Sequence, residues 1–343
     1  MKEFIEMDDE RRNLVCTQTA AQLNLADVAV EKDFWVCWTL DKLFRLPKWG
    51  KSLTFKGGTS LSKGWKLIER FSEDIDIVID RGVLGFSGDK APENALSKKQ
   101  TRKRLDGLKL ASCNCVKNEI LPTLHDAIGK DIPNAISWDL IEDPADSDQQ
   151  TLLFNYPTVF SDKAAYLKRA VKIEMGARSD TDPSEKILIS SYISDVFPNL
   201  FSLATAEVRA VSPKRTFWEK AMLLHEETFR PVDKRRKDQM ARHYYDLYKL
   251  IEAGVAGEAF ADLDLFFSVA EHRKVFFRHN WVDYETLVPG RLRLEPTEKQ
   301  MPDWRSDYAN MQQEMFCGEA PSFDVVMKKV RGFQDKFNAC SGA

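Results

Sequence analysis

The sequence predicts an α/β (α+β) fold, with an α/β core between N-terminal helices and a C-terminal helical domain. Apolar residues recur at helical spacing in residues 9–46 and again from Pro213 onward. Residues 74–80 alternate polar and apolar side chains, as a half-buried strand does. Short apolar runs, typical of further strands, occur at 52–56, 151–160 and 164–177. We therefore expect three parts, 1–48, 49–211 and 212–343.

The remaining elements follow in order along the chain. Pro47 ends the first helical region. A helix is expected over 61–71, a loop over 82–97 and further helix over 98–129. Residues 141–150 form an acidic, turn-rich break. The C-terminal part then reads as amphipathic helices at 216–230 and 240–254, a basic connection at 231–239, and a mostly helical tail over 255–343.

Composition excludes several protein classes. Hydrophobic residues make up 43% of the 343 residues and charged residues 30%, so the chain is too apolar to be disordered. No stretch approaches the ~18 apolar residues of a membrane helix, and the charged start of the chain carries no secretion signal. The six cysteines form no CxxC pair, which argues against a zinc site. We expect a cytoplasmic protein without a membrane partner.

Residues 55–80 carry the main chemical signal. A strand runs into Gly57 and Gly58, and a helix is expected to start near Thr59 and Ser60. Glycines allow close approach of a ligand, and a helix start offers free N–H groups to an anion. The hydroxyls of Thr59 and Ser60 would add hydrogen-bond donors. This pattern indicates a seat for the phosphates of a nucleoside triphosphate, with neighbouring Lys56 and Lys63 as weaker phosphate candidates.

Paired carboxylates follow the phosphate seat. Asp74 and Asp76 are two residues apart on the expected strand, so both face the same way. Two aligned carboxylates repel unless a cation lies between them, and such oxygen ligands suit Mg²⁺ or Mn²⁺. Residues 171–176 alternate as a neighbouring strand, which makes Glu174 the candidate third metal ligand. This layout is typical of a metal-dependent phosphoryl or nucleotidyl transferase.

Five sequence blocks resemble the AbiEii/AbiGii toxin family of nucleotidyltransferases, including its MenT-like members. The blocks are VEKDFW at 30–35, FKGGTSLSK with RFSEDIDI at 55–77, VKIEMGAR at 171–178, WEKAMLLHEETFR at 218–230 and RHYYDLYKL at 242–250. Lys220 and Asp246 occupy the lysine and aspartate positions of the last two blocks. The resemblance implies a polymerase-beta-type nucleotidyltransferase core. It also implies the toxin of a type IV toxin–antitoxin (abortive infection) system, with an antitoxin encoded nearby.

The resemblance also implies residue roles and a substrate. Gly57, Gly58, Thr59 and Ser60 would bind an NTP with the help of Lys220, while Asp74, Asp76 and Glu174 would hold the metal. Asp246 would orient Lys220 or contact the nucleotide. Either basic group before it, Arg242 or His243, could act with it. MenT-like members are similar to enzymes that extend the 3′ end of tRNA, so tRNA is the expected acceptor.

Two basic stretches are consistent with an RNA partner despite the net charge of −3. Residues 98–109 hold six basic residues against one aspartate, and residues 230–242 hold six against two. We expect both to contact an RNA backbone. Two alternatives stay open: nucleotidylation of a protein side chain, and a nucleotide- or antitoxin-binding module without turnover. A pure binding module has no need of two converging carboxylates, which favours the enzyme.

Overall fold

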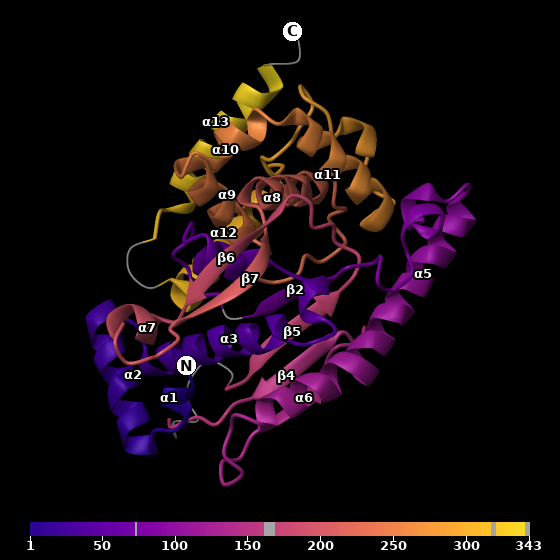
Figure 1. The fold of residues 1–343 in the computed structure, drawn as a ribbon. Coiled ribbons are helices and arrows are strands. Elements are labelled where there is room, and N and C mark those ends of the chain that lie inside the picture. Colours follow the sequence, from indigo (N-terminus) through magenta and orange to yellow (C-terminus); the bar gives the residue numbers. More distant parts are fainter. Residues whose placement is uncertain (73, 161–168, 317–319, 340–343) are drawn as a thin grey trace. The chain divides into compact units, whose positions relative to one another are not determined.

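The computed structural model describes residues 1–72, 74–160, 169–316 and 320–339. The chain divides into two compact units (Figure 1). Unit 1 comprises residues 1–64 and 72–211, and unit 2 comprises residues 65–71 and 212–343. Unit 1 contains the sheet, and unit 2 is built mainly from helices. The predicted α/β class with flanking helices is confirmed, while the exact three-part division stays a prediction.

A mixed sheet forms the centre of unit 1. Its strands are β1 (Leu53–Lys56), β2 (Ile75–Ile79), β3 (Asp139–Glu142), β4 (Thr151–Asn155), β5 (Val171–Gly176), β6 (Ser184–Ser190) and β7 (Thr205–Val211). In the described ranges their order is β3-β4-β5-β2-β1-β7-β6. The middle strand β2 pairs antiparallel with β1 and parallel with β5. Lys56 at the end of β1 therefore lies beside Asp76 near the start of β2, and Asp76 lies beside Glu174 of β5. These three strands carry the candidate site.

Three helices lie at the start of the chain, and the third of them packs on the sheet. They are α1 (Lys2–Ile5), α2 (Asp9–Leu23) and α3 (Asp27–Phe44). α3 packs on β5 and β7, and its Phe34, Trp35 and Trp38 are buried. The continuous helix expected over 9–46 is instead two helices, because Asn24 adopts a left-handed conformation (φ 53°) that ends α2.

The helix predicted over 61–71 is wrong beyond Gly64. Helical structure runs from α4 (Gly57–Thr59) through a π-helical turn (Ser60–Gly64) and then stops. Residues 65–71 belong to unit 2, where the N–H of Phe71 donates to the carbonyl of Met315 (2.8 Å). Arg70 also binds Asp246 there through two hydrogen bonds. These long-range contacts outweigh the local helical tendency that the sequence pattern indicates.

The rest of unit 1 follows the expected pattern with two differences. Helix is continuous from α5 (Lys98–Cys115) through a π-helical turn into α6 (Leu121–Gly129), as predicted. β3 was not predicted, because its side chains do not show a clean apolar alternation. The strand expected over 164–177 is β5, and its predicted start at 164–168 lies outside the described residues. A short helix, α7 (Tyr192–Val196), follows β6.

Unit 2 has an aromatic core. Its helices are α8 (Pro213–Thr228), α9 (Arg242–Glu252), α10 (Val255–Phe260), α11 (Leu263–Phe276), α12 (Met301–Met315) and α13 (Phe323–Ala339). The Trp218 ring on α8 lies 4.8 Å from the Phe266 ring and 5.2 Å from the Phe337 ring, centre to centre. This packing joins α8, α11 and α13 into one core. No helix in the described ranges is both long and apolar enough to span a membrane.

A buried histidine makes the stability of unit 2 sensitive to pH. The Nδ1 atom of His225 accepts a hydrogen bond from the N–H of Arg293 (2.9 Å), so its Nε2–H donates to the Thr286 hydroxyl (2.9 Å). Burial lowers the pKa of His225 to about 4, and the Arg293 guanidinium adds to the effect. The unfolded chain, with an ordinary histidine pKa near 6.5, therefore takes up this proton first.

We expect stability to be retained above about pH 6.5 and to fall as the pH drops towards 4. The His225 contribution to this loss is roughly 3 kcal/mol, because each unit of pKa difference corresponds to about 1.4 kcal/mol. Urea unfolding at a series of pH values measures it. The His225→Gln variant should have a shallower slope in this window. A slope equal to that of the unchanged protein would contradict the assignment.

Candidate active site

Gly57 and Asp76 meet where β1 ends. Lys56, the last residue of β1, lies opposite Asp76 in the antiparallel register, so the next residue, Gly57, turns beside that carboxylate. Gly57 has a φ of +80°, and a Cβ placed on it would lie 1.9 Å from Oδ2 of Asp76. Only glycine satisfies both conditions without displacing the carboxylate. The predicted phosphate seat and the predicted metal ligand are therefore neighbours in unit 1.

Replacing Gly57 by alanine should impair the site more than the fold. The new methyl group must push the Asp76 carboxylate aside, and alanine is also strained at this positive φ. We expect nucleotide transfer to fall by roughly 10²-fold, because small misplacements of catalytic groups have effects of that size. A Gly85→Ala variant is the matched control, since Gly85 has a φ of +83° with open space around it. Equal losses of activity in both variants would contradict the steric argument.

The hydroxyls of Thr59 and Ser60 brace the turn. The Thr59 hydroxyl donates to the carbonyl of Asp74 (2.5 Å), and the Ser60 hydroxyl donates to the carbonyl of Gly57 (2.9 Å). Both residues are almost fully buried. The expectation that these hydroxyls are open donors to phosphate is therefore not met in this structure. The Thr59 side chain instead ties the turn to the residue before β2, and the Ser60 side chain closes the turn on itself.

Charged side chains of β2 and β5 lie beside one another at this site. In the parallel register Asp76 is the partner of Glu174 and Ile75 the partner of Ile173. Asp74 comes one residue before β2, and its charge acts on Lys172. Lys172 forms an ion pair with Glu174, and burial opposes its charge, but Glu174 and Asp74 outweigh burial and raise the pKa of Lys172. The structure thus places a lysine among the carboxylates, on the face that the sequence pattern predicts for Glu174.

The donors suit a magnesium ion held mainly by two residues. In the described part of the chain, no group of three or more His, Cys, Asp or Glu side chains is arranged to hold a metal. Glu174 points to Lys172 instead. Mg²⁺ is commonly held by one or two carboxylates, with substrate phosphates and water completing its shell. Asp74 and Asp76, beside a glycine turn, fit that donor set, and the third ligand stays a prediction.

Lys63 does not act as a phosphate ligand in this structure. Its ammonium forms a buried ion pair with Asp33 and lies 3.2 Å from the centre of the Tyr192 ring. Burial opposes its charge, but Asp33 outweighs burial and raises the pKa of Lys63. Asp33 also accepts the N–H of Tyr192 (2.7 Å). The VEKDFW and GGTSLSK blocks are therefore linked by a structural ion pair, while Lys56 hydrogen-bonds Ser179 (2.8 Å).

Lys220 and Asp246 meet in unit 2. The Lys220 ammonium lies 2.8 Å from Oδ2 of Asp246, and only 7% of Lys220 is exposed. Arg70 donates to both Asp246 oxygens at 2.7 and 2.8 Å. Asp246 is fully buried, so of its two predicted roles the structure favours orienting Lys220. Nδ1 of His243 lies 3.4 Å from the Lys220 ammonium, which makes His243, of the two basic residues before Asp246, the one in contact with Lys220.

The charges of this cluster follow from its surroundings. Burial would raise the pKa of Asp246, but Arg70 and Lys220 outweigh burial and hold this pKa far below its ordinary value. Burial lowers the pKa of Lys220 and Arg70 lowers it further, although Asp246 acts to raise it. Burial and the nearby Lys220 also keep the pKa of His243 well below 6.5, so the ring is neutral near pH 7. The Asp246 carboxylate is therefore the shared partner of two cations, Arg70 and Lys220.

Sequence reasoning gave no role to Arg70 or Lys172 and left His243 undecided. Arg70 lies in RFSEDIDI, but its partner is 176 positions away, and no local pattern points to it. His243 was one of two open choices. Lys172 shares the face of Glu174 by simple alternation, so the two-residue spacing could have identified it.

Comparisons with known proteins give the family. A model of the nucleotidyl transferase AbiEii toxin, type IV toxin–antitoxin system, matches residues 38–333. None of the curated proteins compared with the chain matches it significantly. Among solved structures, it is similar to the nucleotidyltransferase toxin MenT4 of Mycobacterium tuberculosis H37Rv, with 16% identity, 97% of this chain and 90% of that chain covered, and a TM-score of 0.49. JHP933 of Helicobacter pylori is also similar, with 16% identity, 92% and 98% covered, and a TM-score of 0.36. Because the family model spans most of its length, the chain belongs to the AbiEii family of type IV toxin–antitoxin nucleotidyltransferases.

Proposed function

We propose that this nucleotidyltransferase transfers a nucleoside monophosphate from an NTP to the 3′ end of an RNA, with tRNA as the acceptor, and that it requires Mg²⁺ or Mn²⁺. The observation that carries the proposal is the contact between the Gly57 turn and the Asp76 carboxylate. Such a contact brings the place for phosphates next to the place for a metal. Family membership supports the reaction class.

The residues of unit 1 have distinct tasks in this reaction. The Gly57–Gly58 turn, braced by Thr59 and Ser60, presents backbone N–H groups to the triphosphate. Asp74 and Asp76 hold the metal, and Glu174 is the candidate to complete its shell or to accept the proton of the attacking hydroxyl. When bound, the metal neutralises charge that develops on the phosphate oxygens.

Lys220 is the proposed cation for the triphosphate in unit 2. Its ammonium is held in one place by Asp246, which Arg70 fixes in turn. A fixed cation costs little further ordering when it meets a phosphate. We assign Asp246 and Arg70 as positioning residues, because Arg70 donates to both Asp246 oxygens and Asp246 in turn binds the Lys220 ammonium.

An RNA acceptor is supported by exposed cations on α5. Lys98, Lys99, Arg102 and Lys103 are exposed near its start. By contrast, Lys109 is paired with Asp148, and Arg104 donates to the carbonyl of Ala91. The first turns of α5 therefore offer positive charge to a phosphate backbone.

The proposed setting is that of a toxin in the cytoplasm, where NTPs and tRNA are present. A cognate antitoxin is the expected protein partner, since the family is defined by toxin–antitoxin systems. If expression arrests growth, Asp74→Ala and Lys220→Ala should each relieve the arrest. Arrest that persists in both variants would point to a cause other than catalysis.

The test of the acceptor uses each of the four NTPs labelled at the α-phosphate, with Mg²⁺ and either purified total tRNA or RNase-treated lysate protein. Label on the 3′ end of tRNA supports the proposal. Label on protein alone would replace it with protein nucleotidylation. No label on either, with unchanged protein and Asp76→Asn indistinguishable, would favour a module without turnover.

A further inference from the structure

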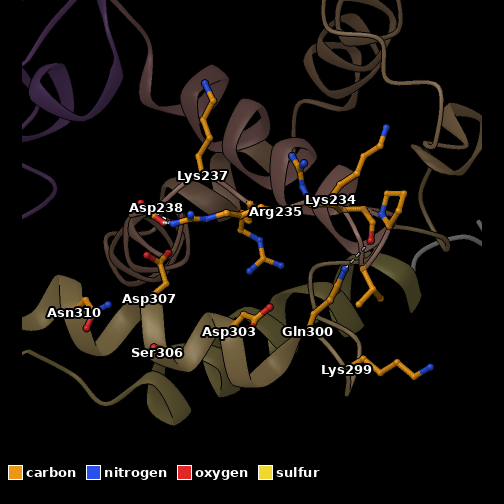
Figure 2. A pocket seen from close by; sticks show the side chains of 14 residues that line it. Lys234, Arg235, Lys237, Asp238, Lys299, Gln300, Asp303, Ser306, Asp307 and Asn310 are labelled. Carbon is orange, nitrogen blue, oxygen red and sulfur yellow. Dashed lines mark hydrogen bonds and ion pairs between the residues drawn. The ribbon is translucent and has the colours of Figure 1, made fainter. Parts of the chain in front are cut away.

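A pocket of about 340 Å³ lies within unit 2, apart from the Lys220–Asp246 pair, which does not line it. It is formed by the segment between α8 and α9 and by the region around the start of α12 (Figure 2). Six of its lining residues are cationic: Arg230, Lys234, Arg235, Arg236, Lys237 and Lys299. Three are acidic: Asp238, Asp303 and Asp307. The pocket therefore carries a positive excess in a chain whose total charge is negative.

Part of this charge is used to build the pocket. Arg230 makes two hydrogen bonds of 2.6 Å to the Glu227 carboxylate. Arg236 reaches the same carboxylate at 3.4 Å, and its guanidinium lies 3.7 Å from the centre of the Trp304 ring. Asp307 accepts the backbone N–H groups of Gln239 and Ala241, both at 2.7 Å. These contacts fix the walls, and they also occupy one of the three acidic side chains.

Three lysines are not used in this way. Lys234, Lys237 and Lys299 are exposed, and among the described residues none has a carboxylate partner within ion-pair distance. In Figure 2 a dashed line joins Arg235 to Asp238, while the three lysines extend without one. Ammonium groups that have no carboxylate partner and stand on flexible stems are suited to phosphate oxygens, which they meet as point charges.

The aromatic side chains nearby argue against base recognition. The Lys234 ammonium lies 4.2 Å from the centre of the Trp281 ring, and the Trp281 ring stacks on His279 with the ring centres 4.4 Å apart. The Arg230 guanidinium also lies 5.5 Å from the centre of the Trp281 ring, so the indole already has three neighbours. Contacts made here would go to the backbone of a nucleic acid, which positions a strand without reading its sequence.

We propose that this pocket binds the phosphodiester backbone of the acceptor RNA through Lys234, Lys237 and Lys299. The choice of RNA rests on the proposed function, whereas the positive pocket stands on the contacts above. Of the six cations in the pocket, Arg230 and Arg236 are structural, and the three lysines supply the binding charge.

The test compares two triple variants of the full chain. K234Q/K237Q/K299Q removes the three pocket lysines, and K328Q/K329Q/K336Q removes three exposed lysines of α13 that do not line this pocket. Binding of a fluorescein-labelled tRNA transcript is followed by anisotropy at several salt concentrations, without NTP. We expect the pocket variant to bind at least tenfold more weakly at low salt. Its slope of log affinity against log salt should fall by about 2, at about 0.7 to 0.9 per phosphate contact. The control should stay close to the unchanged protein.

Three results would overturn the proposal: equal affinity and slope in the pocket variant, equal losses in the two variants, or no binding of tRNA by the unchanged protein. Because this binding assay requires no turnover, its result does not depend on whether the protein catalyses nucleotide transfer. If nucleotide transfer is absent while tRNA binding depends on the pocket lysines, only the reaction assignment is lost. Circular dichroism of both variants checks that the fold is retained.

Discussion

Asp76→Asn should lower nucleotide transfer by roughly 10²- to 10³-fold while leaving the fold intact. The amide keeps the size of the carboxylate, so the close contact with Gly57 is preserved and only the charge is lost. A catalytic metal contributes several kcal/mol to transition-state stabilisation, and about 1.4 kcal/mol corresponds to a tenfold change in rate. The measurement is the rate of label transfer at saturating NTP, with the melting temperature recorded beside it.

Asp80→Asn is the matched control for this variant. Asp80 follows the same strand, but it is exposed and accepts the N–H of Gly82 (2.7 Å). We expect its transfer rate to stay within about twofold of the unchanged protein, since surface substitutions usually have small effects. If Asp76→Asn retained the activity of Asp80→Asn, Asp76 would have no part in the reaction.

Asp246→Ala should destabilise unit 2 by about 3–5 kcal/mol. Removing this carboxylate leaves Arg70 and Lys220 as buried cations without their shared partner, and breaking a buried pair in this way has a cost of that size. Chemical denaturation followed by tryptophan fluorescence measures the change, because Trp218 and Trp304 are buried in the core of this unit.

Asp324→Ala provides the comparison on the surface of the same unit. Asp324 also pairs with an arginine, Arg305, but the two side chains are 70% and 49% exposed. Exposed pairs contribute little to stability, so this variant should be nearly as stable as the unchanged protein. Similar losses of stability in both variants would show that burial of the Asp246 cluster does not increase its contribution to stability.

Asp246→Asn tests the positioning role, because a folded variant with a normal KM and a reduced kcat indicates a misplaced Lys220.

The sequence predicted those parts of the fold and site that depend on neighbours along the chain. Alternation placed β2 and β5 correctly, and the Gly57–Gly58 pair marked the turn after β1. The same alternation placed Asp74 and Asp76 together on the strand, but only Asp76 lies on β2, and Asp74 comes one residue before it. The register of β2 and β5 then brought Asp76 beside Glu174.

What the sequence could not predict depends on which partners the fold brings to each side chain. From the sequence alone, the hydroxyls of Thr59 and Ser60 are suitable donors to a phosphate. In the fold they donate instead to backbone carbonyls. Lys63 has the sequence context of a phosphate ligand, but Asp33, thirty positions earlier, binds it. Residues 65–71 have a helical pattern that is overridden by Asp246, far along the chain. Hydrogen bonds that form on folding decided the first case, and charge pairs between residues far apart in the sequence decided the other two.

The central claim is that the chain transfers the α-phosphate of an NTP together with its nucleoside. It is tested most directly by incubating the protein with tRNA and Mg²⁺ in parallel reactions that contain NTP labelled at either the α- or the γ-phosphate. We predict that the RNA acquires label only from the α position, while the γ label leaves as pyrophosphate, and that Asp76→Asn loses the α label. RNA or protein labelled from the γ position would instead show phosphoryl transfer and contradict the account.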